Sequence, residues 1–242
     1  MNNKINIHIL GDSHSRKLFS DKFESWEESK PHETLNYLQN DFHFTTSSVP
    51  GATAHSILKN KSKTNAHYWF VKSLDTYGNK DYIGLLIGEI DCNFLIWKKT
   101  DIKNQTIDKC LNETILRYRK FVENYMIAKH SSHKIILIGV TLPSIHDPNQ
   151  HFDVGKDLVR NFEGGFIPDI KSRTELTILF NKKIKEIATD LKCNYLDITD
   201  QTLDKKAGTI HEEYTHGLNV DNHLPIMKTY KFWIEEFRKI VE

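Results

Sequence analysis

The chain is poor in cysteine, has no long apolar run and carries almost no net charge. Its three cysteines, Cys92, Cys110 and Cys193, are an odd number without the spacing of metal ligands, so neither a disulfide framework nor a structural zinc site is predicted. The 33 basic side chains face 32 acidic ones, which leaves no long-range field to attract nucleic acid or an anionic membrane. No stretch approaches the ~20 apolar residues that a membrane helix needs. We expect no nucleic-acid partner and no membrane span.

The thirteen histidines raise the question of a metal, but their spacing does not support one. No pair shows the i, i+4 helical spacing of a zinc protease, and we expect no metal and no cofactor. At the start of the chain, Asn6 and His8 interrupt an apolar stretch that is too short for a secretory signal. We therefore expect a cytoplasmic protein with reduced thiols. The sequence gives no prediction of the oligomeric state.

Apolar patterning predicts an α/β fold. Short apolar or alternating runs predict β-strands at residues 5–10, 42–49, 82–87, 134–140 and 194–198. Apolar residues at helical spacing predict helices over 111–125 and 176–191, and a last helix that begins at Pro225. We assign the apolar stripes of these helices, Leu179 and Met227 included, to core packing. The alternation predicts a doubly wound, three-layer sandwich with a mostly parallel central sheet.

We find no internal repeat or low-complexity linker, and a single domain over 1–242 is the simplest organisation for a chain of this length. The least regular stretch is 144–172, with a possible short helix at 156–161. It follows the fourth strand, and long connections of this kind are often binding loops. We interpret it either as an insertion that forms part of a substrate pocket or as a surface excursion.

The most informative feature is the polar turn Gly11-Asp12-Ser13-His14-Ser15, which directly follows the first strand. A strand that delivers a serine hydroxyl to the edge of a sheet can position a nucleophile; alternatively, Asp12 or Ser13 simply caps the next helix. At the other end of the chain, Asp221-Asn222-His223 precedes the last helix and supplies a carboxylate and an imidazole. In a parallel sheet, ligands bind beyond the carboxyl ends of the strands. The segments at 11–15, 50–53 and 88–91 all follow strands, so they are expected at one edge.

Together these segments resemble the blocks of the SGNH (GDSL-type) hydrolases. Gly11–Ser15 resembles the first block in a GDSH variant, and Pro50-Gly51-Ala52-Thr53 resembles the second. Gly88-Glu89-Ile90-Asp91 stands where the third block, Gly-x-Asn-Asp, is expected, and the His223 segment resembles the fifth. The matches run in the right order over nearly the whole chain. The resemblance implies a flavodoxin-like SGNH hydrolase fold.

The resemblance also implies roles for these residues. Ser13 would be the nucleophile, His223 the general base and Asp221 the acid of the triad. The backbone amides of Ser13 and Gly51 would bind the oxyanion. Asp12 is expected to be a structural hydrogen-bonding residue of the turn.

Two positions depart from the pattern of the family. Ile90 replaces the asparagine that donates to the oxyanion, and Asn93 is the candidate substitute. Asp221 is two residues before His223, whereas the family reads Asp-x-x-His. If Asp221 does not reach the imidazole, a backbone carbonyl or Asp91 would orient it.

Three other polar residues lie at the same strand ends. His14, Glu89 and Asp91 are the candidate substrate-binding residues. His14 either hydrogen-bonds across the site or caps the helix that follows it.

The function that follows is a serine esterase acting on small acyl esters, acetyl esters above all, of a carbohydrate or another small molecule. The same residues would serve an O-acyltransferase in surface-polysaccharide modification, which differs only in excluding water from the acyl-enzyme. A non-catalytic binding domain that retains the fold is the third interpretation, and Ile90 and the short Asp221 spacing favour it.

Overall fold

The computed structural model describes residues 4–18, 33–39, 41–145, 168–217 and 221–242. A six-stranded sheet forms its centre, in the order β2-β3-β1-β4-β5-β6. The strands are β1 (Ile5–Gly11), β2 (Glu33–Gln39), β3 (Phe42–Ser48), β4 (Tyr82–Leu86), β5 (Ile135–Ile138) and β6 (Asn194–Leu196). All neighbours pair in parallel except β2, which runs antiparallel to β3. The predicted α/β fold with a mostly parallel sheet is confirmed, and its five parallel strands follow the flavodoxin-like order.

Strand β2 was not expected from the sequence. Its residues, Glu-Thr-Leu-Asn-Tyr-Leu-Gln, include few apolar side chains. An edge strand is held by backbone pairing to a single neighbour, so it does not need the continuous apolar run that marks a central strand.

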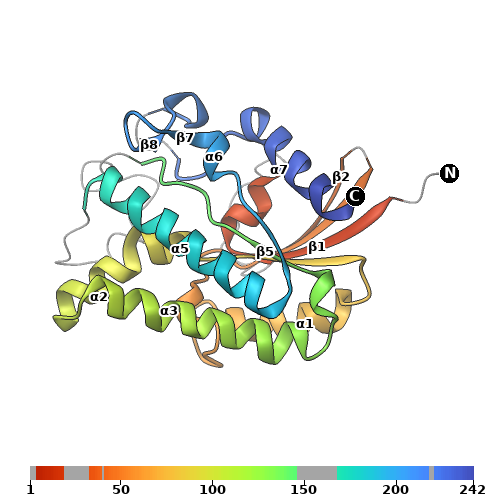
Figure 1. The fold of residues 1–242 in the computed structure, drawn as a ribbon. Helices are drawn as coiled ribbons and strands as arrows, with labels where there is room; N and C mark the ends of the chain where they lie inside the picture. Colours follow the sequence, from red (N-terminus) through yellow and green to blue (C-terminus); the bar gives the residue numbers. More distant parts are fainter. Residues whose placement is uncertain (1–3, 19–32, 40, 146–167, 218–220) are drawn as a thin grey trace.

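The helices lie on both faces of this sheet. They are α1 (Ala66–Tyr77), α2 (Ile96–Lys103), α3 (Ile107–Phe121), α5 (Ile170–Leu191), α6 (Thr199–Thr202) and α7 (Ile226–Val241). Figure 1 shows α1 and α3 below the sheet and α7 above it, next to the 3₁₀ helix η1 (Ser13–Leu18). The shorter elements are η2 (Ala54–Ser56), the π-helices η3 (Asp91–Leu95) and η4 (Val122–Ile127), η5 (Ser132–Lys134), η6 (Glu212–Tyr214), and the hairpin β7 (Leu203–Asp204) with β8 (Thr209–Ile210).

The core confirms most of the predicted stripes. In α7, Phe237 is buried and packs against Phe42 and Phe44 of β3, with ring centroids 6.4 and 5.1 Å away. Met227 is an error of the sequence prediction, because it is 72 % exposed. Ile226 occupies the buried side of the first turn, and one residue along a helix rotates the next side chain by about 100°. Leu179 of α5 is also exposed rather than buried.

The predicted irregular stretch 144–172 ends before residue 172, because α5 begins at Ile170. Asp169 caps this helix through a hydrogen bond from the Ser172 amide to its carboxylate, at 2.7 Å. The expected short helix at 156–161 lies outside the described residues.

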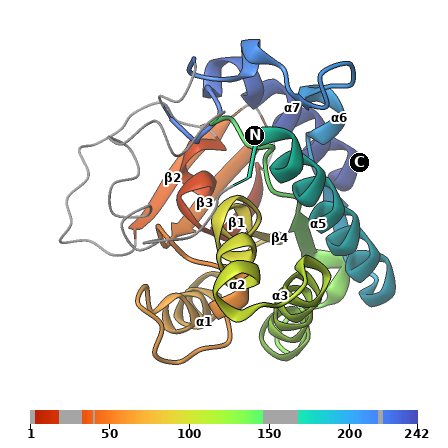
Figure 2. The ribbon, with the colours of Figure 1, turned by 90° about the vertical axis from the view of Figure 1, so that its left-hand side faces the viewer.

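The carboxyl ends of the parallel strands face the viewer in Figure 2. The turn after β1, the loop after β3 and the start of α2 all lie at this edge. The chemistry-bearing segments predicted from the sequence are therefore gathered at one side of the sheet, as the parallel topology requires.

Candidate active site

The turn that carries Ser13 is built around Asp12. The Asp12 amide donates to the Leu86 carbonyl at the end of β4, at 3.2 Å. The Asp12 carboxylate accepts from the His14 amide at 2.9 Å, and the Asp12 carbonyl accepts from the Ser15 hydroxyl at 2.8 Å. Asp12 is buried, whereas Ser13 is only half-buried. These contacts fit the structural role expected of Asp12, and they leave Ser13 accessible.

The loop that carries Gly51 is tied to the same turn. The Ser48 hydroxyl donates to the Asp12 carbonyl at 2.8 Å, and the Val49 amide donates to the Gly11 carbonyl at 2.8 Å. The next residues form a turn in which the Ala52 amide donates to the Val49 carbonyl, at 3.0 Å. Gly51 has a φ of 76°, as the third position of a type II turn requires. A larger residue there would be strained.

The structure pairs Asp221 with His223 despite their short separation in sequence. Asp221 Oδ1 lies 2.6 Å from His223 Nδ1 and also accepts from the His223 backbone amide at 3.0 Å. Burial raises the pKa of Asp221, but the hydrogen bond and charge of His223 outweigh it and hold that pKa well below its usual range. Asp221 therefore reaches the imidazole, and the alternative that Asp91 orients it does not hold in this structure.

The Ser13 turn and the Asp221–His223 pair meet through His14. The His14 and His223 rings are in contact, with centroids 4.4 Å apart and planes tilted by 35°. His14 Nε2 donates to the Asn222 carbonyl at 3.2 Å. The residue next to Ser13 is thus in contact with both of the residues that follow Asp221. Sequence segments more than 200 residues apart form one site.

Asp91 does not face this site. It is fully buried after β4, and its carboxylate oxygens accept from the Ala54 amide at 2.6 Å and the His55 amide at 3.1 Å. Burial raises its pKa to about 7, although the two amide donors oppose the shift. The carboxylate thereby anchors η2, which follows the Gly51 loop. This arrangement differs from the substrate contact expected for Asp91.

Replacing Asp91 with asparagine should loosen the loop that carries Gly51. The amide nitrogen of the new side chain would face a backbone N–H, and leaving a buried donor unsatisfied costs about 1–3 kcal/mol. We expect a loss of that size in the free energy of unfolding by urea, with Glu186→Gln on the exposed side of α5 as the control. Unchanged stability in Asp91→Asn would show that the anchor is dispensable.

Glu89 and Asn93 belong to a buried polar network. Asn93 Nδ2 donates to Glu89 Oε1 at 2.8 Å, and Asn93 Oδ1 accepts from Arg173 of α5 at 2.9 Å. Glu89 is only 3 % exposed, and burial raises its pKa, against the charge of His14. The side-chain amide of Asn93 thus already has two protein partners. This arrangement differs from the oxyanion role expected for Asn93.

Two members of this network were missed by the sequence analysis. Arg173 falls on the buried stripe of α5 with Leu176 and Phe180, and a charged residue on an apolar stripe is the signal that was available. Asn222 lies between the two residues that were singled out, and its side chain donates to Glu89 Oε1 at 3.3 Å. No pattern in the sequence marks that contact.

His14 lies among acidic groups. Burial lowers its pKa, but the charges of Glu89 and Asp12, together with hydrogen bonds to Asp12 and to the Asn222 carbonyl, outweigh burial and raise the pKa to about 9. His14 Nδ1 is 3.4 Å from Asp12 Oδ1 and 3.9 Å from Glu89 Oε2. His14 is therefore cationic at neutral pH.

This charge predicts an alkaline loss of stability. A group whose pKa is raised on folding stabilises the protein fully below its unfolded pKa, near 6.5 for histidine, and loses that contribution as the pH rises through the folded value. The contribution is on the order of 3 kcal/mol, lost between about pH 6.5 and 9. We expect a fall in Tm over this window that is smaller in His14→Gln. The matched control is His133→Gln, since His133 is exposed; equal pH profiles in His14→Gln and the wild type would contradict the prediction.

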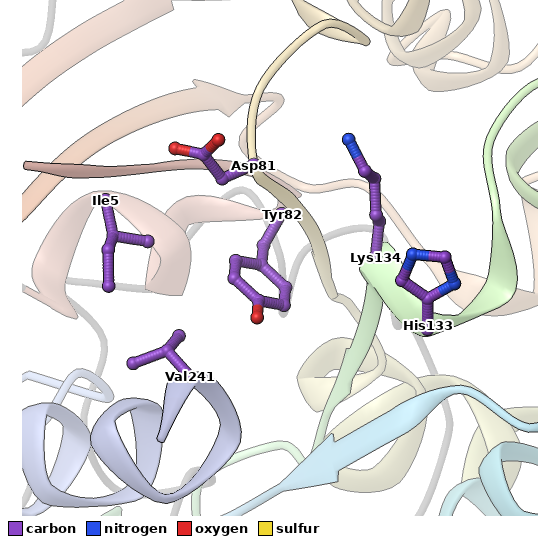
Figure 3. Close-up of a pocket in the computed structure, with 6 residues that line it drawn as sticks. All are labelled: Ile5, Asp81, Tyr82, His133, Lys134 and Val241. Atoms are coloured by element: carbon purple, nitrogen blue, oxygen red, sulfur yellow. The ribbon is translucent and has the colours of Figure 1, made fainter.

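A hollow of about 370 Å³ lies at the opposite edge of the sheet. It is lined by Ile5, Asp81, Tyr82, His133, Lys134 and Val241. Figure 3 shows these side chains at the starts of β1, β4 and β5 and at the end of α7. Its one carboxylate, Asp81, accepts from the Asn6 amide at 2.8 Å, so it has a structural partner already. The hollow is separate from the Ser13 edge.

Other features constrain the chemistry of the described residues. Within the described ranges, no three or more histidine, cysteine or acidic side chains are grouped to hold a metal ion. Likewise, none of the helices described is both long and apolar enough to cross a bilayer.

The three cysteines are free thiols, and Cys92 is buried. Burial raises the pKa of the Cys92 thiol, which disfavours the thiolate that nucleophilic attack requires.

Comparisons with known proteins show similarity at the level of the fold. No family model and no curated protein matches the chain. Among solved structures, a variant of Axe2, an acetylxylan esterase from Geobacillus stearothermophilus, aligns with a TM-score of 0.55 and 12 % identity, over 100 % of this chain and 96 % of that chain. The acetyl xylan esterase AlAXEase aligns with a TM-score of 0.51 and 12 % identity, over 98 % of this chain and 100 % of that chain. Axe2 structures include serine, aspartate and histidine substitutions described as catalytic mutants.

Proposed function

We propose that this protein is a serine esterase that removes acetyl groups from a carbohydrate. The observation that carries the proposal is the 2.6 Å contact between Asp221 Oδ1 and His223 Nδ1, with the His223 ring in contact with the ring of His14, the residue next to Ser13. A carboxylate that binds Nδ1 fixes the imidazole tautomer and leaves Nε2 to act as the base. The fold that the chain shares with two acetylxylan esterases supports an acetylated sugar as substrate.

The reaction proceeds through an acyl-enzyme. Ser13 Oγ attacks the ester carbonyl while His223 Nε2 takes the hydroxyl proton, and the carbonyl π electrons move to the oxygen as the O–C bond forms. The backbone amides of Ser13 and Gly51 are the proposed donors to this oxyanion. Its collapse breaks the bond to the sugar oxygen, which takes the proton from His223. Water activated by His223 then releases acetate and restores Ser13.

Ile90 has a consequence for the rate. An aliphatic side chain at this position cannot donate a hydrogen bond, and removing one oxyanion donor typically costs on the order of 10²–10³ in kcat. The proposed site therefore relies on backbone donors alone. A cytoplasmic location stays part of this proposal.

The test is hydrolysis of acetylated xylo-oligosaccharides. It is measured as acetate release and as a mass loss of about 42 Da for each acetyl group removed. We expect the wild type to deacetylate these oligosaccharides and to turn over p-nitrophenyl acetate faster than the butyrate ester. Ser13→Ala should hydrolyse none of these esters. Acetyl transfer to a sugar hydroxyl in place of acetate release would favour the acyltransferase. Inertness of the folded wild type toward both esters, without labelling by a fluorophosphonate, would favour a binding domain.

A further inference from the structure

Asn222, the residue between Asp221 and His223, forms a closed ring of polar contacts with Glu89 and His14. Asn222 Nδ2 donates to Glu89 Oε1 at 3.3 Å, and the Asn222 carbonyl accepts from His14 Nε2 at 3.2 Å. His14 Nδ1 and Glu89 Oε2 lie 3.9 Å apart and close the ring as an ion pair. The ring therefore joins the turn after β1, the segment after β4 and the segment before α7.

The ring acts on a segment without regular secondary structure. Residues 221–224 lie in neither a helix nor a strand, so side-chain contacts decide their position. Ser144 donates to the Asp221 carbonyl at 3.0 Å, Asn222 makes the two bonds of the ring, and Leu224 is buried in the core. Because Asn222 is held through both its side chain and its carbonyl, its neighbours on each side are also held in place.

Burial makes these contacts strong. Glu89 and His14 are each 3 % exposed, and a buried charge is stabilised only by its partners. The groups that face His14 are Asp12 from its own turn, Glu89 after β4, and Asn222 and His223 before α7. Glu89 Oε1, which accepts from Asn222, also accepts from Asn93, and Asn93 in turn is held by Arg173. The ring is thus fixed to the helical layer.

We infer that Glu89 and His14 are positioning residues that clamp Asn222 and so hold the Asp221–His223 pair against the Ser13 turn. This inference rests on the proposed esterase function for its effect on rate. It assigns Glu89 and His14 a role other than contact with the substrate. It also gives a reason for a buried glutamate beside Ile90, because Glu89 has Asn222 and His14 as partners there.

The experiment compares Glu89→Ala with Glu89→Gln and with the exposed control Glu186→Ala. Alanine removes both carboxylate oxygens of Glu89. A misplacement of about 1 Å at a catalytic group costs on the order of 10²-fold in rate. We expect kcat for p-nitrophenyl acetate to fall by about 10–100-fold in Glu89→Ala, with KM almost unchanged. Glutamine keeps an acceptor for Asn222. It also removes the charge that raises the His14 pKa most, so a neutral His14 accepts at Nδ1 from the glutamine amide while Nε2 still donates to Asn222, and Glu89→Gln should recover most of kcat. The control Glu186→Ala should match the wild type.

Hydrogen exchange gives a second measurement that does not depend on activity. The amides of residues 221–224 should exchange faster in Glu89→Ala than in the wild type, and close to the wild-type rate in Glu89→Gln and Glu186→Ala. Unchanged kcat and unchanged exchange in a folded Glu89→Ala would overturn the clamp. A lower Tm with unchanged kcat would also overturn it, since that is a purely structural effect.

The outcomes separate this inference from the proposed function. A wild type that hydrolyses no ester refutes the esterase, and the exchange rate of residues 221–224 then decides the clamp alone. If Glu89→Ala does not fold, Glu89→Gln decides it: a loss of activity together with wild-type exchange at residues 221–224 would contradict the clamp.

Discussion

Replacing Ser13 with alanine is expected to abolish both ester hydrolysis and covalent labelling by a fluorophosphonate. The change removes one oxygen, and without the nucleophile no acyl-enzyme forms. Losing a triad serine costs roughly 10⁴–10⁶-fold in kcat, and the remainder comes from binding and the oxyanion donors. The turn itself should survive, because Asp12 and Ser15 make the hydrogen bonds that shape it. The measurement is kcat for p-nitrophenyl acetate and the mass of the labelled protein.

A matched serine variant shows that the effect belongs to this position. Ser131 is exposed before β5, at the opposite edge of the sheet, and Ser131→Ala should keep wild-type turnover and labelling. Full turnover by a folded Ser13→Ala would exclude Ser13 as the nucleophile and with it the mechanism. Labelling of the wild type without hydrolysis would instead point to an acyl-enzyme that waits for an acceptor other than water.

Replacing Asp221 with alanine is expected to lower kcat by roughly 10⁴-fold, as loss of a triad aspartate does. In this structure Asp221 Oδ1 binds both the ring and the backbone amide of His223. Its removal frees the ring to rotate and to adopt the other tautomer, in which Nε2 carries the proton and cannot accept one from Ser13. KM for a small ester should change little, because Asp221 lies behind the imidazole.

The control for this variant is Asp101→Ala, an exposed aspartate of α2, which should match the wild type. Asp221→Asn distinguishes charge from geometry, since it keeps a hydrogen-bonding group of the same shape. We expect Asp221→Asn to be nearly as slow as Asp221→Ala, because only a carboxylate stabilises the imidazolium that forms during attack. Activity of both variants within a few fold of the wild type would show that another group orients His223.

Much of the fold was predictable because the signals are local. Strands β1, β4 and β5 carry apolar residues that are buried in the sheet, and β3 begins with the buried Phe42 and Phe44. The edge strand β2 was not predicted, since its pairing is made by the backbone and its side chains carry no such pattern. Met227 shows the same limit on a helix: the apolar spacing locates a stripe, but Ile226 rather than Met227 takes the buried side of the first turn of α7.

The position of Ser13 and of the Asp221–His223 segment at strand or helix boundaries was determined by the sequence, because parallel strands bring their carboxyl ends to one edge. The partners of these residues were decided only by the tertiary structure. Asp221 and Asp91 were both candidates for the imidazole, and the packing of η2 engages Asp91 with the Ala54 amide. The Glu89–Asn222 contact joins residues 133 positions apart. Such contacts depend on how loops from different strands meet, and no periodicity along a single segment encodes that.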